Sequence, residues 1–178
     1  MEQPQLLQIP LDDKDVVYTP DWVAADMVDF FKPSGRILEP CKGNGVFLKY
    51  LPTAEWCEIQ EGRDFFAWSE HVDWIITNPP FAQFGKFVTH SMSLSDNIVF
   101  LVPCYKVFNA YKTIVTIFNW GGIRYMRVFG PGGRLGFSYG YSIAAFHFQK
   151  GYKGPMYSSI YQLPSTNPDK PDDAHRIG

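Results

Sequence analysis

The residues best suited to chemistry stand in one run, Asn78-Pro79-Pro80-Phe81, directly after the strand-like stretch 72–76. The two prolines fix the backbone and remove two amide donors, and Pro79 keeps Asn78 out of the helical region. The corner presents two hydrogen-bond acceptors side by side, the side-chain oxygen of Asn78 and the carbonyl of Pro79. Two such acceptors suit a flat amino group with two hydrogens, and Phe81 can stack on the ring that bears it. The alternative is a proline-rich turn without chemistry.

A glycine turn after a short apolar strand is the second candidate. Gly43 and Gly45 follow the strand at 36–39 and precede a predicted helix. At both positions the backbone can approach a ligand closely, where a side chain would collide. A phosphate cradle fits poorly, because Glu39 places an acid inside the turn and would repel pyrophosphate. Many tight turns without a ligand use the same two glycines.

A third candidate is the carboxylate that ends the next predicted strand, at 54–59. Glu58 lies there, 19 residues after Glu39, and Glu61 is the alternative acid. Nucleotide-binding α/β units hold ribose hydroxyls with a carboxylate at about this distance. We therefore predict that Glu58 contacts a ribose, although a single acid in a loop is also common as a solvated residue.

Four motifs, in the same order along the chain, resemble those of class I S-adenosylmethionine-dependent methyltransferases. Asn-Pro-Pro-Phe resembles the catalytic motif of enzymes that methylate planar amino groups, in adenine of DNA or RNA or in protein glutamine. Glu39-Pro40, followed by Gly43 and Gly45, resembles the cofactor loop of the DNA adenine methyltransferases. Tyr-Thr-Pro before a helix resembles their N-terminal motif, and Gly-Arg-Asp-Phe after the second strand resembles their next one.

The resemblance implies a role for each matched residue. The region around Thr19 would contact the methionine end of the cofactor, and Glu39 would accept hydrogen bonds from its ammonium or hydroxyl groups. Asp64 would accept from the adenine amine of the cofactor, with Phe65 flanking the ring. The predicted cofactor-binding residues are Tyr18, Thr19, Pro20, Glu39, Pro40, Gly43, Gly45, Glu58, Asp64, Phe65 and Asn78. The predicted catalytic residues are Asn78, Pro79, Pro80 and Phe81.

The implied activity is methyl transfer from S-adenosylmethionine to the exocyclic amino group of adenine in DNA, after base flipping. An RNA adenine methyltransferase and an inactive, methyltransferase-like nucleic-acid-binding subunit are the alternatives. A protein-glutamine methyltransferase fits less well, because Glu-Pro in the cofactor loop is unlike that group. No target-recognition region is visible. Three alternatives would account for the missing region: weak specificity, base reading by residues 105–140, or a partner subunit or second copy of the chain that supplies recognition.

Strand–helix alternation predicts the elements that position these residues. We expect an α/β, Rossmann-like class I methyltransferase fold, with a mostly parallel sheet flanked by helices and the site at the carboxyl ends of the strands. A helix is predicted to start with Thr19 as N-cap and Pro20 at its first position. Later helices are indicated by apolar stripes at 84–92 and 111–118. The later strands are predicted at 97–103, 123–129 and 142–149.

The predicted organisation is one catalytic domain at 16–163, with an arm at 1–15 and a disordered tail at 164–178. Residues 130–140 are rich in glycine and include Arg134. This segment fits either a clamp on nucleic acid or a flexible hairpin tip. No separate target-recognition domain is expected.

Charge divides sharply along the chain. Residues 1–96 hold 15 acidic and 7 basic residues, whereas residues 97–168 hold seven basic residues and no acid. Basic side chains among aromatic residues favour phosphates and unstacked bases. The predicted nucleic-acid-binding residues are Lys106, Lys112, Arg124, Arg127 and Arg134. A chance division of scattered surface charge is the alternative.

Other signals narrow the class of protein. The three cysteines form no Cys-x-x-Cys pair, so neither a disulfide framework nor a metal site is expected, and a reducing cytoplasm is the default. There is no run of 18 apolar residues and the amino terminus lacks signal-peptide features, so no membrane partner is predicted. Cys104 does not follow the strand after which a catalytic cysteine would be expected. It is therefore interpreted as structural. Surface or packing positions are expected for His71, His90, His147 and His175.

Overall fold

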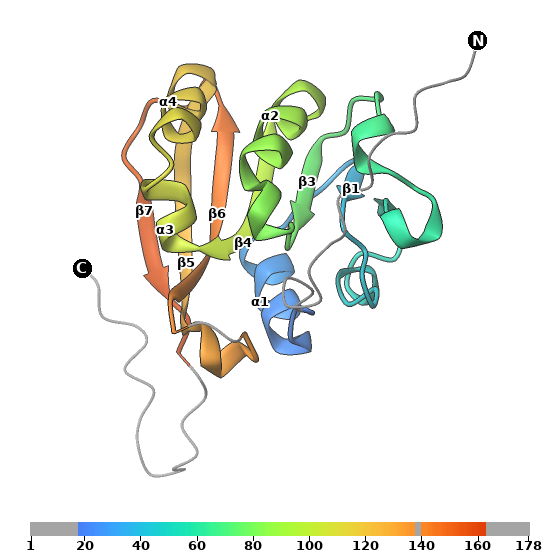
Figure 1. Ribbon diagram of the computed structural model, residues 1–178, viewed down its shortest axis with the longest axis horizontal. Coiled ribbons are helices and arrows are strands. Elements are labelled where there is room, and N and C mark those ends of the chain that lie inside the picture. Colours follow the sequence, from blue (N-terminus) through green and yellow to red (C-terminus); the bar gives the residue numbers. More distant parts are fainter. Residues whose placement is uncertain (1–17, 138–139, 163–178) are drawn as a thin grey trace.

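A mixed sheet forms the centre of the computed structural model, which describes residues 18–137 and 140–162 (Figure 1). Within these residues seven strands lie in the order β2-β1-β3-β4-β6-β5-β7. Their bounds are β1 Ile37–Glu39, β2 Glu55–Trp56, β3 Trp74–Thr77, β4 Asn97–Pro103, β5 Gly121–Pro131, β6 Ser142–Lys150 and β7 Tyr157–Ile160. β6 is antiparallel to β4 and β5, and the other pairs are parallel. The predicted mostly parallel sheet is confirmed.

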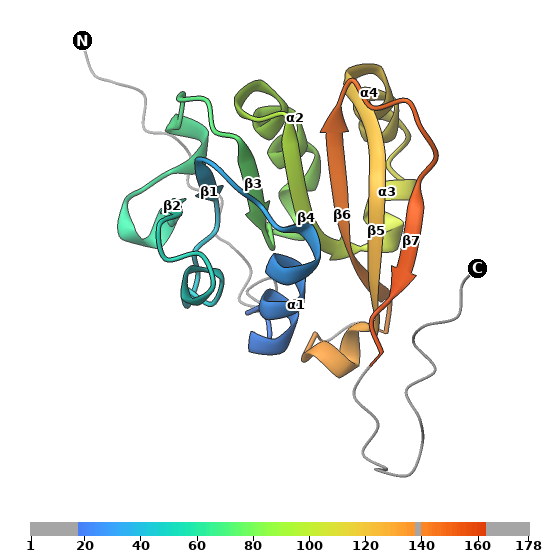
Figure 2. The ribbon, with the colours of Figure 1, turned by 180° about the vertical axis from the view of Figure 1, so that it is seen from behind.

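Helices cover both faces of this sheet. α2 (Phe84–Leu94), α3 (Cys104–Phe108) and α4 (Tyr111–Trp120) lie on one face, and α1 (Asp21–Phe31) lies on the other (Figures 1 and 2). Two buried clusters correspond to these two layers. β4 contributes to both, because its alternate side chains point to opposite faces: Ile98 packs beneath α2 and Val99 beneath α1. Burial of both faces explains the continuous apolar run in β4.

Local elements near the site differ from the sequence prediction in three places. α1 begins at Asp21, and Pro20 is the N-cap with an extended ψ of 145°, so Thr19 does not cap the helix. The helix expected after Gly45 is a single 3-10 turn, Phe47–Lys49. The strand expected at 54–59 is only the two residues of β2, because a 3-10 turn, Ile59–Glu61, follows closely.

Later in the chain the predicted strands are confirmed, and one strand was missed. β5 and β6 match the predictions near 123–129 and 142–149. β7 was not expected, because its four residues are largely exposed and carry no apolar alternation. It extends the sheet by pairing with β5. The predicted arm at 1–15 and tail at 164–178 lie outside the described residues.

An ion pair joins α1 to β5 and engages Arg127, one of the residues predicted to bind nucleic acid. Nε and Nη2 of Arg127 donate to the two carboxylate oxygens of Asp26, at 3.0 and 2.7 Å, and both side chains are less than one-fifth exposed. The Arg127 guanidinium also lies 4.8 Å from the centre of the Phe30 ring. Arg127 therefore holds two layers together and is not placed on a docking face.

Among the described residues, no helix has the length and apolar character needed to cross a membrane.

Replacement of Asp26 by Asn tests the structural role of this pair. The substitution leaves the half-buried Arg127 without its counter-charge, so we expect a loss of about 1.5–3 kcal/mol in the free energy of unfolding. Urea denaturation measures the loss. Lys49→Gln is the matched control: it breaks the exposed pair between Lys49 and Asp21, so it should have little effect. Equal effects of the two variants would contradict the structural role of Arg127.

Candidate active site

The candidate site lies where the chain changes direction across the sheet. β1 sits between β2 and β3, so the chain leaves β1 to one side first and returns on the other. Open α/β sheets bind ligands at this switch point, outside the carboxyl ends of the strands. Glu39 is the last residue of β1 and Thr77 the last of β3, and the Thr77 hydroxyl donates a hydrogen bond to Glu39 Oε1. The predicted cofactor loop and the Asn78 corner therefore start from strand ends that are bonded together.

Glu39 is a buried acid whose hydrogen bonding is incomplete. Its exposed fraction is 1%, and Oε1 also accepts from the Cys41 amide at 2.9 Å. Oε2 is buried, with no hydrogen-bond partner among the described residues. Burial raises the pKa of Glu39 to about 8, although the bonds from Thr77 and Cys41 oppose the shift. A cation next to Oε2 would supply the missing partner and favour the ionised carboxylate.

The glycine turn packs closely against Tyr18 of the N-terminal motif and against Glu58. Gly43 has a φ of +52° and Gly45 a φ of +77°, which favour glycine. A Cβ added at Gly43 would lie 3.3 Å from the Tyr18 ring. The Gly43 amide donates to Glu58 Oε2 at 2.8 Å. Tyr18, Gly43 and Glu58, which are far apart in the sequence, thus meet at one place.

Contacts between the turn and the segment after β2 fix this arrangement. Lys42 pairs with Glu61 at 2.6 Å, and the Trp56 ring lies 4.1 Å from Lys42 Nζ and 3.9 Å from the Arg63 guanidinium carbon. Glu61 is therefore engaged with Lys42, and it lies in the 3-10 turn that follows Glu58. Glu58 Oε1 accepts from the Gln60 amide at 3.1 Å, so this carboxylate also caps the turn that follows.

Phe65 does not occupy the place that the resemblance implies for it. Its side chain is 3% exposed and stacks on Phe87, with ring centres 5.1 Å apart. The neighbouring Phe66 is 40% exposed, and its amide donates to Asp64 Oδ1 at 2.9 Å. Phe66 is therefore the ring beside Asp64 that a ligand can reach. Two adjacent phenylalanines carry no pattern that shows which one is buried, so the sequence alone does not separate them.

The Asn78 corner follows β3 without a break. Asn78 is partly buried, Pro79 is buried, and the Pro80 carbonyl accepts from the Gln83 amide at 3.0 Å. Phe81 stacks on Phe137, with ring centres 5.8 Å apart and planes at 21°. The glycine-rich segment thus packs against this corner.

The structure divides the basic residues that the sequence grouped together. Arg124 donates to Gln149 at 3.0 Å and is half-buried, so like Arg127 it serves internal packing. In contrast, Lys106, Lys112 and Arg134 pair with no carboxylate within residues 18–137 and 140–162. These three remain candidates for nucleic-acid contact.

Cys104 and His147 lie in packed positions of the fold. Burial raises the pKa of Cys104, so its thiol stays protonated and a structural role fits. His147 lies 3.1 Å from Asn97 Oδ1, and burial lowers its pKa to about 4. Among the described residues, no three His, Cys, Asp or Glu side chains could hold a metal ion. His175 lies outside those residues.

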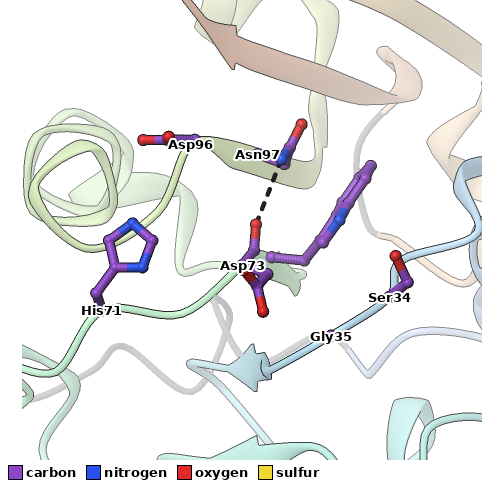
Figure 3. A pocket seen from close by; sticks show the side chains of 7 residues that line it. Ser34, Gly35, His71, Asp73, Asp96 and Asn97 are labelled. Atoms are coloured by element: carbon purple, nitrogen blue, oxygen red, sulfur yellow. Dashed lines mark hydrogen bonds between the residues drawn. The ribbon is translucent and has the colours of Figure 1, made fainter.

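A hollow on the surface lies at the opposite edge of the sheet (Figure 3). Its lining includes Trp74 and Asn97, the first residues of β3 and β4. Asn97 Nδ2 donates to the Asp73 carbonyl there at 3.4 Å, as the dashed line in Figure 3 shows. Because Asn78 follows the other end of β3, this hollow is separate from the candidate site.

Comparisons with solved structures identify the fold. A protein from Listeria monocytogenes assigned to the class I S-adenosylmethionine-dependent methyltransferases superposes with a TM-score of 0.62 at 14% identity, over 86% of this chain and 68% of that one. The fold is that of a class I methyltransferase. No protein-family model and no curated protein matches the sequence.

Two further similar structures come from restriction–modification systems. The modification subunit assigned to a type I restriction enzyme from Vibrio vulnificus has a TM-score of 0.60 at 16% identity, over 87% of this chain and 49% of that one. A chain from a type I restriction–modification complex has a TM-score of 0.62 at 16% identity, over 83% of this chain and 45% of its own. The present chain therefore spans about half the length of these two relatives in fold.

Glu39→Gln tests the buried acid through the pH dependence of stability. The folded-state pKa of Glu39 is about 8, above the ordinary 4.5, so its contribution to stability is fully present below about pH 4.5 and is lost as the pH rises through 8. We expect the wild type to lose stability relative to Glu39→Gln over this interval. Chemical denaturation at a series of pH values measures the difference. Parallel stability curves for the two proteins would contradict the raised pKa.

Proposed function

We propose that this chain is an S-adenosylmethionine-dependent methyltransferase that methylates the exocyclic amino group of adenine in DNA. One observation carries the proposal: Asn78 and Pro79 follow β3 directly, across the switch point from the Gly43–Gly45 turn after β1. The hydrogen bond between Thr77 and Glu39 joins these two strand ends. The class I fold supports the same activity.

The residues at the switch point suit the proposed cofactor. S-adenosylmethionine, when bound, supplies an electrophilic methyl group on a positively charged sulfur and also carries an ammonium group. Glu39, with its buried Oε2 that lacks a partner among the described residues, suits a cationic ligand. The close approach of the Tyr18 ring to Gly43 leaves room for backbone only. Glu58 would bind the ribose, and Asp64 with Phe66 would bind the adenine of the cofactor.

Asn78 and Pro79 would act on the substrate amine. The lone pair of this nitrogen is conjugated into the adenine ring, which makes it a poor nucleophile. Hydrogen bonds from its two hydrogens to Asn78 Oδ1 and the Pro79 carbonyl would favour a tetrahedral, more nucleophilic nitrogen. Flipping the base out of a duplex costs a few kcal/mol, and stacking on Phe81 would offset about 1–3 kcal/mol of that. Phe137 covers one face of Phe81, so the base would use the other.

We also propose that a partner subunit supplies target recognition. The two restriction–modification chains of similar fold are about twice as long as this chain. The described residues form a single sheet with its covering helices, to which no second folded unit is added. A partner subunit that selects the DNA sequence would fit this arrangement.

Transfer of a labelled methyl group tests the activity directly. The chain is incubated with labelled S-adenosylmethionine and duplex DNA, single-stranded DNA, RNA or protein, and the products are digested to nucleosides. We expect N6-methyladenine from DNA. Label in RNA alone would favour an RNA methyltransferase. Cofactor binding without transfer to any acceptor would indicate an inactive binding subunit.

Gly43→Val tests the cofactor site. The larger side chain meets the Tyr18 ring and a φ of +52°, so binding of S-adenosylmethionine or its demethylated product should be lost. Isothermal calorimetry measures the binding. Gly133→Val is the matched control, because a Cβ at Gly133 would meet no atom within 4 Å. Undiminished binding by Gly43→Val would show that the cofactor binds elsewhere. No binding by the wild type would contradict the proposal that the chain uses S-adenosylmethionine.

Asn78→Ala separates binding from chemistry. Loss of one preorganised polar contact in a transition state lowers turnover by about a hundred- to a thousandfold. The affinity for S-adenosylmethionine should fall far less than turnover, because the loop after β1 is intact. Single-turnover methyl transfer and calorimetry provide the two readouts, with the exposed Asn119→Ala as control. Near-normal turnover by Asn78→Ala would exclude this residue from the mechanism.

A further inference from the structure

The apolar stripe that predicts α4 faces solvent. Tyr111, Val115 and Phe118 lie at positions i, i+4 and i+7, and their exposed fractions are 80%, 38% and 50%. Positions with this spacing share one side of a helix. The buried residue of α4 is Ile117, which packs on the sheet. Phe108, at the end of α3, is 44% exposed as well. Large apolar side chains gathered on one surface indicate a binding partner.

The charge around these rings favours a polyanion as that partner. α2, α3 and α4 together contain no Asp or Glu, and each contains one lysine: Lys86, Lys106 and Lys112. Lys106 and Lys112 pair with no carboxylate among the described residues. A purely apolar partner would cover these ammonium groups without replacing their water, which costs free energy.

The combination of exposed rings and lysines distinguishes between forms of nucleic acid. A duplex presents phosphates, but its base faces are stacked on one another and cannot reach Tyr111 or Phe118. A single strand presents both, and every base has a face that can stack on an aromatic ring. The arrangement on α4 therefore fits unpaired nucleotides better than a duplex.

The position of this surface connects it with the candidate site. α3 begins at Cys104, directly after β4, at the carboxyl edge where β3 ends and Asn78 follows. α4 then runs back along the same face of the sheet that α2 covers (Figure 1). A strand that lies along α4 and α3 would thus lead toward the Asn78 corner.

We propose that the α3–α4 surface, defined by Phe108, Tyr111, Lys112 and Phe118, binds single-stranded nucleic acid by base stacking and phosphate contact. The inference rests on the proposed function in one respect, because the bound segment would be an unpaired part of the strand that carries the target adenine. The surface would also give the described residues a place at which to hold the substrate strand.

Fluorescence anisotropy with a labelled single-stranded 12-mer and the full chain tests the surface. Tyr111→Ala and Phe118→Ala should each weaken binding by at least about fivefold, the loss expected for one stacked base. Tyr157→Ala is the matched control and should change nothing, because the 53%-exposed Tyr157 ring lies against Tyr125, which packs on the α1 face of the sheet. Lys112→Gln should lower the slope of log affinity against log salt by about 0.7, the value for one phosphate of a single strand. Lys32→Gln should leave that slope unchanged.

Three results would overturn the inference: wild-type affinity in both ring variants, binding of the duplex in preference to the single strand, or a ring variant that dissociates a dimer without changing oligonucleotide binding. The methyl-transfer assay on the same proteins keeps this outcome separate from the proposed function. Oligonucleotide binding that depends on the rings, without methyl transfer by the wild type, would support the surface and refute the activity. Normal methyl transfer and affinity in the ring variants would refute the surface and support the activity.

Discussion

The arrangement of the site depends on one buried hydrogen bond, from the Thr77 hydroxyl to Glu39 Oε1. It joins the carboxyl ends of β1 and β3 at the place where the sheet changes direction. Burial of a carboxylate costs free energy unless it is hydrogen-bonded or protonated, and both apply to Glu39, whose pKa is raised to about 8. The two loops that follow, one with glycines and one with two prolines, take their positions from these strand ends. A cationic ligand would complete the contacts that the fold leaves open at Oε2.

The charged side chains on the two sides of the Asn78 corner differ in sign. The segment after β2 brings Glu58, Glu61 and Asp64 to the side where the glycine turn lies, while α3 and α4 on the other side of the Asn78 corner contain lysines and no acid. A group of acidic side chains suits a cofactor with a positive sulfur, and a basic surface suits a strand with negative phosphates. The proposed reaction needs the cofactor and the nucleic-acid strand side by side, at the amino group that Asn78 would bind.

Much of the fold was predictable from the sequence. Strand β4 is apolar at every position after Asn97. Gly43 and Gly45 both have the positive φ values that favour glycine. The sequence does not show which member of an adjacent pair is buried, so it does not separate the buried Phe65 from the exposed Phe66. Nor does it show long-range pairing: Arg127 counts as a surface charge until Asp26, 101 residues earlier, is found against it. The stripe on α4 predicted a helix correctly, but its exposure depends on tertiary packing.

The central claim is that the ligand edge of the sheet is the carboxyl edge, between β1 and β3. Backbone amide NMR during titration with S-adenosylmethionine tests this most directly, because it reports on both edges in one experiment. The account predicts shifts concentrated at Gly43, Gly45, Glu58 and Asn78, and almost none near Trp74 and Asn97, which line the hollow at the amino edge. Shifts concentrated around Trp74 and Asn97, with the Gly43 and Asn78 amides unchanged, would contradict it.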